Sequence, residues 1–379
     1  MHILPNVMFA TATTFCSFAA PAQDLNVRIG HVAPMSGPFA WLGADVEGGA
    51  RLAIEELNAK GVAIGGRKAK FELISQDDKG DPKQAVAAAQ ILVDAKASGI
   101  EGHSFSGASI AASKVYCAAG IPQISPMATS PRFTRNGCKT TFRVVADDTQ
   151  IGMALARYAV NELKVARIAV IDDHSDYGQG IVEAFSVAAT AAGAKIVATQ
   201  HIDDKTADFT AVLTAIKSKR PDLIFFGGYS PQAGTMISQM KQIGLLARFA
   251  GGDGVCTPDI PQRAGDAIAD VQVLCARPGD AGRDSPAMAK FRADFKQKFD
   301  TDSLTYAPYA YDAVRVLVDA MVRAGSAEPG TYLPALAATN GYKGLTGTIS
   351  FDEKGDLKNG AVTMFTFKGR KMEVLTVVR

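Results

Sequence analysis

The chain has 379 residues, of which 47% are hydrophobic and 21% are charged, and its formal net charge is +2. This length exceeds the usual size of one hydrophobic core, so we expect two domains. The nearly balanced charge gives no broad positive field, which argues against nucleic acid as a partner.

The first residues are typical of a secretory signal peptide. Residues 7–20 contain no charge and are mostly apolar or small, and Ala20-Pro21-Ala22 follows them. The apolar run is too short to span a bilayer, and Ala20 and Ala22 satisfy the small-residue rule for cleavage. No Lys or Arg precedes the run, so a disordered start is the alternative. We predict a signal peptide over residues 1–22, cleaved near Ala22, and an exported mature protein.

Four cysteines remain after this cleavage, and an even number in an exported protein indicates two disulfides. They allow three pairings, and we predict the one between sequence neighbours, Cys117 with Cys138 and Cys256 with Cys275, which closes two loops of about 20 residues. Buried free thiols are the alternative. No C-x-x-C motif occurs, and the five histidines lack metal-ligand spacing, so we expect no metal and no cofactor. The four residues are Cys117, Cys138, Cys256 and Cys275.

Apolar strand-like runs alternate with amphipathic helical segments along the chain. Strands are predicted near residues 27–32, 71–74, 121–125, 167–171, 195–198, 223–226 and 249–250. Helices are predicted over residues 45–60, from Asp81-Pro82 to 96, and from Ser106 to Gly120. Two alternating runs, 362–367 and 374–378, read as a terminal hairpin. The alternation predicts an α/β fold with two doubly wound, Rossmann-like lobes.

Two hydroxyl residues follow consecutive strand ends of one predicted βαβ unit. Ser106 opens a helix, and Thr129 lies in the turn after the next strand. Ligands of open parallel sheets bind at the carboxyl ends of the strands, and a helix N-terminus favours an anion. Both residues are candidates for holding a carboxylate. The alternatives are a simple helix cap and a simple turn.

Motifs of common α/β enzymes are missing from the sequence. We find no G-x-G-x-x-G, no G-x-x-x-x-G-K-[ST] and no G-x-S-x-G. A secreted amidohydrolase with Ser106 or Thr129 as nucleophile is the rival hypothesis, but no motif places a base beside either hydroxyl. We therefore expect a protein that is not an enzyme.

Six motifs in order along the mature chain support a family resemblance. The chain resembles the leucine/isoleucine/valine-binding family of periplasmic binding proteins, the type I receptors of ABC importers. The motifs are APMSGP at 33–38, DD at 77–78 with DPKQAV at 81–86, SPMATSP at 125–131, DYGQG at 176–180, FGGY at 226–229 and FDEKGDL at 351–357.

The resemblance implies a fold of two lobes joined by three crossover strands. The first lobe would contain residues 24–146 plus 279–357, and the second would contain residues 147–278 plus 358–379. It also implies an amino-acid ligand, most simply a branched-chain or other aliphatic one, delivered by a monomeric receptor to ABC permease subunits in the inner membrane. A sensor ectodomain for amino acids or amides is an alternative with the same binding chemistry.

Site residues also follow from the resemblance. The ligand carboxylate would meet Ser106, Thr129 and the backbone at Met127, while the ammonium group would meet Tyr177 and Asp253. The family commonly has glutamate at this last position. The walls around the ligand side chain fall at Trp41, Leu42 and Tyr306. The disulfide familiar in the family would join positions Gly80 and Phe105, which are not cysteines here.

Overall fold

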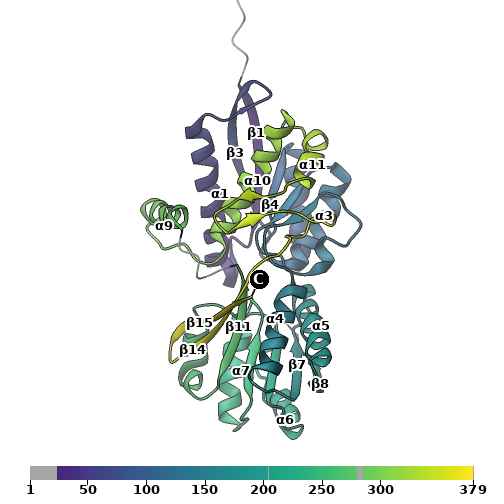
Figure 1. Ribbon diagram of the computed structural model, residues 1–379, viewed down its shortest axis with the longest axis vertical. Helices are drawn as coiled ribbons and strands as arrows, with labels where there is room; N and C mark the ends of the chain where they lie inside the picture. Colours follow the sequence, from purple (N-terminus) through teal and green to yellow (C-terminus); the bar gives the residue numbers. More distant parts are fainter. Residues whose placement is uncertain (1–23, 204, 280–284, 379) are drawn as a thin grey trace, which may run out of the picture.

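The computed structural model describes residues 24–203, 205–279 and 285–378. The predicted signal peptide, residues 1–22, lies outside the described residues. The chain forms two lobes that are stacked end to end, each around its own β-sheet (Figure 1). We call the lobe that contains strand β1 the first lobe and the lobe that contains strand β7 the second lobe.

The sheet of the first lobe has the strand order β2-β3-β1-β4-β5-β6. Its pairs are parallel except for the short β2–β3 pair. The strands are β1 (Leu25–Ala33), β2 (Ala63–Ile64), β3 (Arg67–Asp77), β4 (Gly99–Gly102), β5 (Gln123–Ser125) and β6 (Thr141–Arg143). The helices are η1 (Gly37–Phe39), α1 (Ala40–Lys60), α2 (Pro82–Asp94), α3 (Ser106–Ala119), η2 (Pro131–Phe133), α9 (Pro286–Phe299), α10 (Ala307–Ala324) and α11 (Pro329–Ala337). A separate ribbon pairs β12 (Tyr342–Lys343) with β13 (Thr348–Ile349).

The sheet of the second lobe has the order β15-β14-β11-β10-β9-β7-β8. Its last five strands are parallel, and the terminal hairpin adds two antiparallel strands at one edge. The strands are β7 (Arg167–Asp172), β8 (Lys195–His201), β9 (Leu223–Gly227), β10 (Arg248–Gly251), β11 (Val273–Pro278), β14 (Val362–Lys368) and β15 (Lys371–Val378). The helices are α4 (Asp148–Asn161), α5 (Asp176–Ala191), α6 (Thr210–Ser218), α7 (Ser230–Gln242), α8 (Ile260–Ala264) and η3 (Gly265–Ala269).

Local sequence signals account for several helix ends. The Asp81 side chain accepts hydrogen bonds from the N–H groups of Lys83 and Gln84, and Pro82 occupies the first helical position of α2. Helix α3 ends at Gly120, whose φ of 69° is left-handed. Helix α1 begins at Ala40, five residues before the predicted start, because Leu42 already belongs to its buried face.

Both sheets are covered by helices, so their central strands are apolar on both faces. In the first lobe, Ile29 and Ile100 lie fully buried in neighbouring strands. In the second lobe, Phe225 and Phe226 point to opposite faces of β9 and belong to separate hydrophobic clusters. The fold class expected from the sequence, a type I arrangement of two doubly wound lobes, is confirmed.

Three chain crossings join the lobes, and they lie side by side. They follow β6, follow β11 and precede β14. The Gly279 N–H donates to the Ala361 carbonyl at 2.7 Å, and a Cβ at Gly360 would lie 3.0 Å from the Ala146 Cβ. The strands of each sheet fall within the lobe bounds expected from the sequence, which remain our proposal.

Two disulfides are present, Cys117–Cys138 in the first lobe and Cys256–Cys275 in the second. These are the pairs of sequence neighbours, so the predicted pairing is confirmed. Among the described residues, no helix combines the length and apolarity needed to cross a membrane.

Candidate ligand-binding site

The first lobe contributes a helix N-terminus to the candidate site. Ser106 is the first residue of α3, directly after the turn that follows β4. Its side chain is buried, and its hydroxyl accepts a hydrogen bond from the Ser130 N–H at 3.2 Å. This bond connects the start of α3 to the loop that contains Thr129. The two predicted carboxylate-binding segments therefore lie together, as consecutive strand ends of one sheet require.

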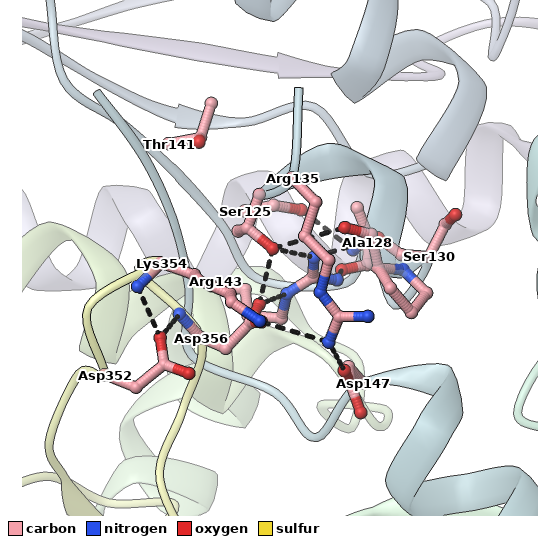
Figure 2. Close-up of polar contacts among 12 residues, drawn as sticks. Ser125, Ala128, Ser130, Arg135, Thr141, Arg143, Asp147, Asp352, Lys354 and Asp356 are labelled. Carbon is pink, nitrogen blue, oxygen red and sulfur yellow. Dashed lines mark hydrogen bonds and ion pairs between the residues drawn. The ribbon is translucent and has the colours of Figure 1, made fainter. Parts of the chain in front are cut away.

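Arg143 holds the loop that contains Thr129 (Figure 2). Its guanidinium is fully buried and donates to the carbonyls of Ala128 and Ser130, at 2.5 and 2.9 Å. The carbonyl of Thr129 itself accepts from the Asp148 N–H at 2.9 Å. All three successive carbonyls are thus occupied, which fixes the backbone that carries the Thr129 hydroxyl.

Asp356 neutralises this buried arginine from the segment before the third crossing. The Arg143 Nε donates to Asp356 Oδ1 at 2.6 Å, and the Thr134 hydroxyl donates to the same oxygen at 2.7 Å. Arg135 lies on the outer side of this pair and also contacts Asp147, the N-cap of α4 (Figure 2). The loop, the first crossing and the third crossing are therefore connected by one charged cluster.

The second lobe contributes Tyr177 and Asp253. Tyr177 lies in the first turn of α5, and its hydroxyl oxygen accepts from the Gly254 N–H at 2.9 Å. A Cβ at Gly252 would lie 2.7 Å from the Tyr177 Oη, and one at Gly254 would lie 2.8 Å from the ring. Because both positions lack a side chain, the loop after β10 can pack against the phenol with Asp253 between the two glycines.

Asp253 is a buried carboxyl group with one oxygen bound and one unbound. Its Oδ2 accepts from the Tyr306 hydroxyl at 2.7 Å, across the lobes. Among the described residues, its Oδ1 has no hydrogen-bond partner. Burial raises the pKa of Asp253, and the Tyr306 hydroxyl opposes that rise. A cationic group at Oδ1 would offset the cost of burying the charge.

Asp45 positions Tyr306. This buried residue of α1 accepts from the backbone N–H groups of Leu304, Tyr306 and Ala307, at 2.6, 3.2 and 3.0 Å. A carboxylate therefore caps the start of α10 from a different helix. Burial raises the pKa of Asp45 to about 6, although these three hydrogen bonds oppose the rise.

Asp148 is a buried carboxyl group at the candidate site that the sequence reasoning missed. It is fully buried at the first position of α4, and within the described part of the chain neither carboxyl oxygen has a hydrogen-bond partner. Burial raises its pKa well above the ordinary value, and the charge of Asp253 raises it further. Asp148 lies in the polar stretch at 146–149. Nothing in that stretch indicates that the carboxyl group of Asp148 is buried near Thr129, in addition to the buried carboxyl group of Asp253.

An aromatic cluster connects the lobes at one side of the site. The Tyr229 ring of the second lobe lies 5.5 Å from Phe39 and 4.9 Å from Phe105 of the first, measured between centroids. Phe105 occupies the space beside Gly80, where a Cβ would lie 2.6 Å from the ring. The positions of the family's disulfide thus hold a glycine and a phenylalanine in contact. The sequence does not predict Tyr229 as a site residue, although it belongs to the FGGY motif at 226–229.

A cavity of about 30 Å³ lies between the lobes, enough for one or two water molecules. Five of the eight predicted ligand-binding residues line it: Trp41, Leu42, Met127, Asp253 and Tyr306. The other three, Ser106, Thr129 and Tyr177, lie outside this cavity and are buried. This cavity is too small for an amino acid, so a bound amino acid would require the lobes to lie further apart than they do here. The ligand-contact roles of all eight residues stay predictions.

The comparisons with known proteins agree with this architecture. Residues 26–371 match the model of a family described as periplasmic binding protein. The Leu/Ile/Val-binding protein homolog 1 of Brucella abortus is 35% identical over 344 residues, 90% of this chain and 91% of that protein. The leucine-, isoleucine-, valine-, threonine-, and alanine-binding protein of Pseudomonas aeruginosa is 34% identical over 351 residues, 93% of this chain and 92% of that protein.

A solved structure with a ligand is also similar. It is the branched-chain amino acid transporter substrate binding protein LivJ from Streptococcus pneumoniae, in complex with isoleucine. That protein superposes with a TM-score of 0.82 at 29% identity, covering 93% of this chain and 99% of its own. Together with the two lobes and their three crossings, these matches show that the chain belongs to the periplasmic binding protein family.

Proposed function

We propose that this protein is the extracytoplasmic receptor of an ABC importer and binds a branched-chain or other aliphatic amino acid between its lobes. The observation that carries the proposal is a pair of buried polar atoms without hydrogen-bond partners, one a hydroxyl that can donate to an anion and the other a carboxylate oxygen that can accept from a cation. Among the described residues, neither Thr129 Oγ1 nor Asp253 Oδ1 has a hydrogen-bond partner. Each lies near a polar group, because the Thr129 hydroxyl opposes the rise in the pKa of Asp148 and the Tyr177 hydroxyl opposes the rise in the pKa of Asp253. A hydroxyl can donate to a carboxylate, and a carboxylate can accept from an ammonium group.

The two ends of a zwitterion would thus be held by different lobes. Thr129 and the Ser106 helix terminus belong to the first lobe, and Asp253 and Tyr177 belong to the second. A ligand that contacts both lobes shifts the equilibrium toward the closed form, because only that form offers all of its partners. The closed form would then be recognised by the permease in the inner membrane.

The apolar lining of the cavity supports an aliphatic ligand side chain. Trp41, Leu42, Met127 and Leu304 contribute apolar side chains to the same cavity that Asp253 lines. The Pseudomonas relative is named for binding leucine, isoleucine, valine, threonine and alanine, and the LivJ structure contains isoleucine. These names motivate the choice of ligands to test.

Binding without catalysis is the simpler use of this site. A hydrolase would need a base beside Ser106 or Thr129. Among the described residues, neither histidine of the first lobe hydrogen-bonds to Ser106 or Thr129. The ring nitrogens of His103 contact Asp78 and the Tyr116 hydroxyl, and His31 contacts Glu101, while its Nε2 has no partner. We therefore propose a periplasmic, monomeric binding protein. A sensor role would use the same binding chemistry, and copurification with permease subunits distinguishes the two.

A screen against the amino acids tests the proposal. A ligand at 100 times its Kd should stabilise the protein by about 2.7 kcal/mol, which thermal unfolding detects. Each amino acid that binds should then be compared by calorimetry with the matching carboxylic acid without an amino group and with its amide. The proposal fails if no amino acid binds, or if the acid without an amino group binds as tightly as the amino acid.

Two variants assign the ends of the ligand. Asp253→Ala should weaken amino-acid binding by about 2 to 5 kcal/mol, mainly because the ligand ammonium is left buried and unpaired. Thr129→Ala should cost less, about 1.5 to 3 kcal/mol, since it removes one hydrogen bond to a charged group. For the ligand without an amino group, the difference in affinity between wild type and Asp253→Ala should be much smaller. Wild-type affinity in both variants would place the site elsewhere.

A further inference from the structure

We propose that Asp172, His174 and His201 form a binding site for a divalent transition-metal ion with the coordination preferences of Zn²⁺. The three residues lie at the ends of two neighbouring strands of the second lobe. Asp172 ends β7 and is the register partner of His201, which ends the edge strand β8. His174 follows two residues after Asp172, with a left-handed φ of 60°. One donor atom from each side chain lies within 4.8 Å of the other two.

Asp172 is held in place by its contacts, whereas the side chains of His174 and His201 are exposed enough to rotate. The Asp172 carboxylate is buried, and its Oδ1 accepts from the His174 N–H at 3.0 Å. The His201 Nδ1 lies 2.7 Å from Asp172 Oδ2, and the His174 Nδ1 lies 4.0 Å from Oδ1. The two imidazole rings are stacked, with centroids 5.1 Å apart and each side chain about half exposed. Small rotations of exposed rings would therefore bring all three donors onto one ion.

The donor set selects the class of ion. Two imidazole nitrogens and one carboxylate oxygen match a zinc site that keeps one coordination position open. Calcium and magnesium prefer oxygen donors alone, so they fit these residues poorly.

The surrounding charge also favours a cation. Asp176 and Asp203 of the second lobe line the same hollow as His174, a space of about 630 Å³ that Lys79 and Asp81 of the first lobe also line. Asp173 lines it too, but its Oδ1 is engaged by the N–H and hydroxyl of Ser175. Arg132 pairs with Asp176 at 3.2 Å, but the carboxylates that line this hollow still outnumber the lysine and arginine beside them, which lowers the cost of bringing a divalent ion to His174.

The proposed metal site is independent of the amino-acid site. All three donors belong to the second lobe, so the ion needs no closure of the lobes. It would connect the ends of β7 and β8 to the loop that leads into α5, the helix that carries Tyr177. Metal binding can therefore be measured with no amino acid present, and its result does not depend on the proposed receptor function.

Calorimetry with Zn²⁺ on metal-stripped protein without an affinity tag tests the proposal. We expect one ion per chain, and Co²⁺ should give visible absorption bands of a site with nitrogen donors. His174→Ala and His201→Ala should each weaken Zn²⁺ binding by at least about 10-fold, and the double variant by more than about 100-fold. The matched control is Asp203→Asn, which removes a charge from the same rim but no proposed donor, and it should bind Zn²⁺ as wild type does.

Three results would overturn the assignment. The first is that the wild-type protein takes up no Zn²⁺. The second is that the double variant binds Zn²⁺ with wild-type affinity. The third is that Asp203→Asn loses as much Zn²⁺ affinity as the histidine variants do. The last result would mean that general negative charge, and not the two imidazoles, attracts the ion. Circular dichroism of each variant establishes that a loss of binding does not come from unfolding, because both histidines are half exposed and are expected to be dispensable for the fold.

Discussion

The Tyr306 hydroxyl donates a hydrogen bond to Asp253 Oδ2 at 2.7 Å, and this bond joins the first lobe to the second at the centre of the candidate site. Both residues are 4% exposed. Tyr306 immediately precedes α10, whereas Asp253 follows β10. The contact exists only when the lobes approach each other, so the structure describes a closed arrangement.

Tyr306→Phe should weaken amino-acid binding by about 1.5 to 3 kcal/mol, because the closed form loses a hydrogen bond to a charged group. Calorimetry with the best amino acid from the screen measures this loss. Small-angle scattering should show a larger fraction of open protein at subsaturating ligand.

Tyr332→Phe is the matched control. That phenol donates to the Ser98 carbonyl at 2.7 Å inside the first lobe, and its removal should change stability but not affinity. If the two variants bound the amino acid equally well, the bond between Tyr306 and Asp253 would have no part in closure.

The sequence predicts the architecture well because its signals are local. The hairpin of β14 and β15, with its turn at 368–371, and the cap formed by Asp81 follow from short patterns, and both are confirmed. The disulfide pairs also follow from spacing. Each of these features depends on residues that are close in the sequence.

The features that the sequence does not predict depend on distant residues. Arg143 and Asp356 are 213 positions apart, and nothing in either neighbourhood shows that they form a buried pair. His174 and His201 lack metal-ligand spacing, yet the parallel pairing of β7 with β8 brings them together. The carboxyl group of Asp148 escapes prediction because burial, a tertiary property, makes it unusual.

Arg143→Met should destabilise the protein by about 3 to 5 kcal/mol, because the buried Asp356 carboxylate loses its direct ion pair and keeps only the partly exposed Arg135 as a cationic neighbour, at 3.7 Å. It also removes the donors to the carbonyls on both sides of Thr129. Chemical denaturation measures the loss.

Arg135→Met is the matched control for Arg143→Met. Arg135 contacts Asp147 and Asp356 from a partly exposed position, at 3.2 and 3.7 Å. Its replacement should therefore lower the free energy of unfolding by no more than about 1 kcal/mol. Equal losses in the two variants would contradict a special role for the buried arginine.

Replacing both members of a disulfide by serine should cost about 3 kcal/mol of stability for either pair, since the two sequence separations, 21 and 19, are similar. Only the pair of Cys256 and Cys275 should also affect binding. The Cys256 N–H donates to the carbonyls of Gly252 and Asp253, so this bridge supports the loop that contains Asp253, the proposed ammonium partner. Thermal unfolding and calorimetry on both double variants separate the effects. Four thiols that alkylate freely in the folded, exported protein would refute the pairing.

Because of Asp45, the free energy of unfolding should decrease as the pH rises from about 4 to about 6. The pKa of Asp45 is about 6 in the folded protein, against an ordinary value of 3.8. In this window the folded state retains a proton that the unfolded chain has already released, so the free energy of unfolding falls as the pH rises. The rise in pKa corresponds to about 3 kcal/mol, because one pH unit is worth about 1.4 kcal/mol.

Asp45→Asn isolates this contribution, since the amide cannot titrate. Its single oxygen can replace Oδ2 as the acceptor for the N–H groups of Tyr306 and Ala307, whereas its NH2 group cannot accept from the Leu304 N–H, so the variant loses stability by an amount that does not depend on pH. Denaturation of both proteins from pH 3.5 to 7 should show the wild type losing about 3 kcal/mol relative to the variant across the window. All other titrating groups contribute equally to the two curves and cancel in the difference. Parallel curves would mean that Asp45 is charged throughout, stabilised by its three backbone donors at the start of α10 in spite of its burial.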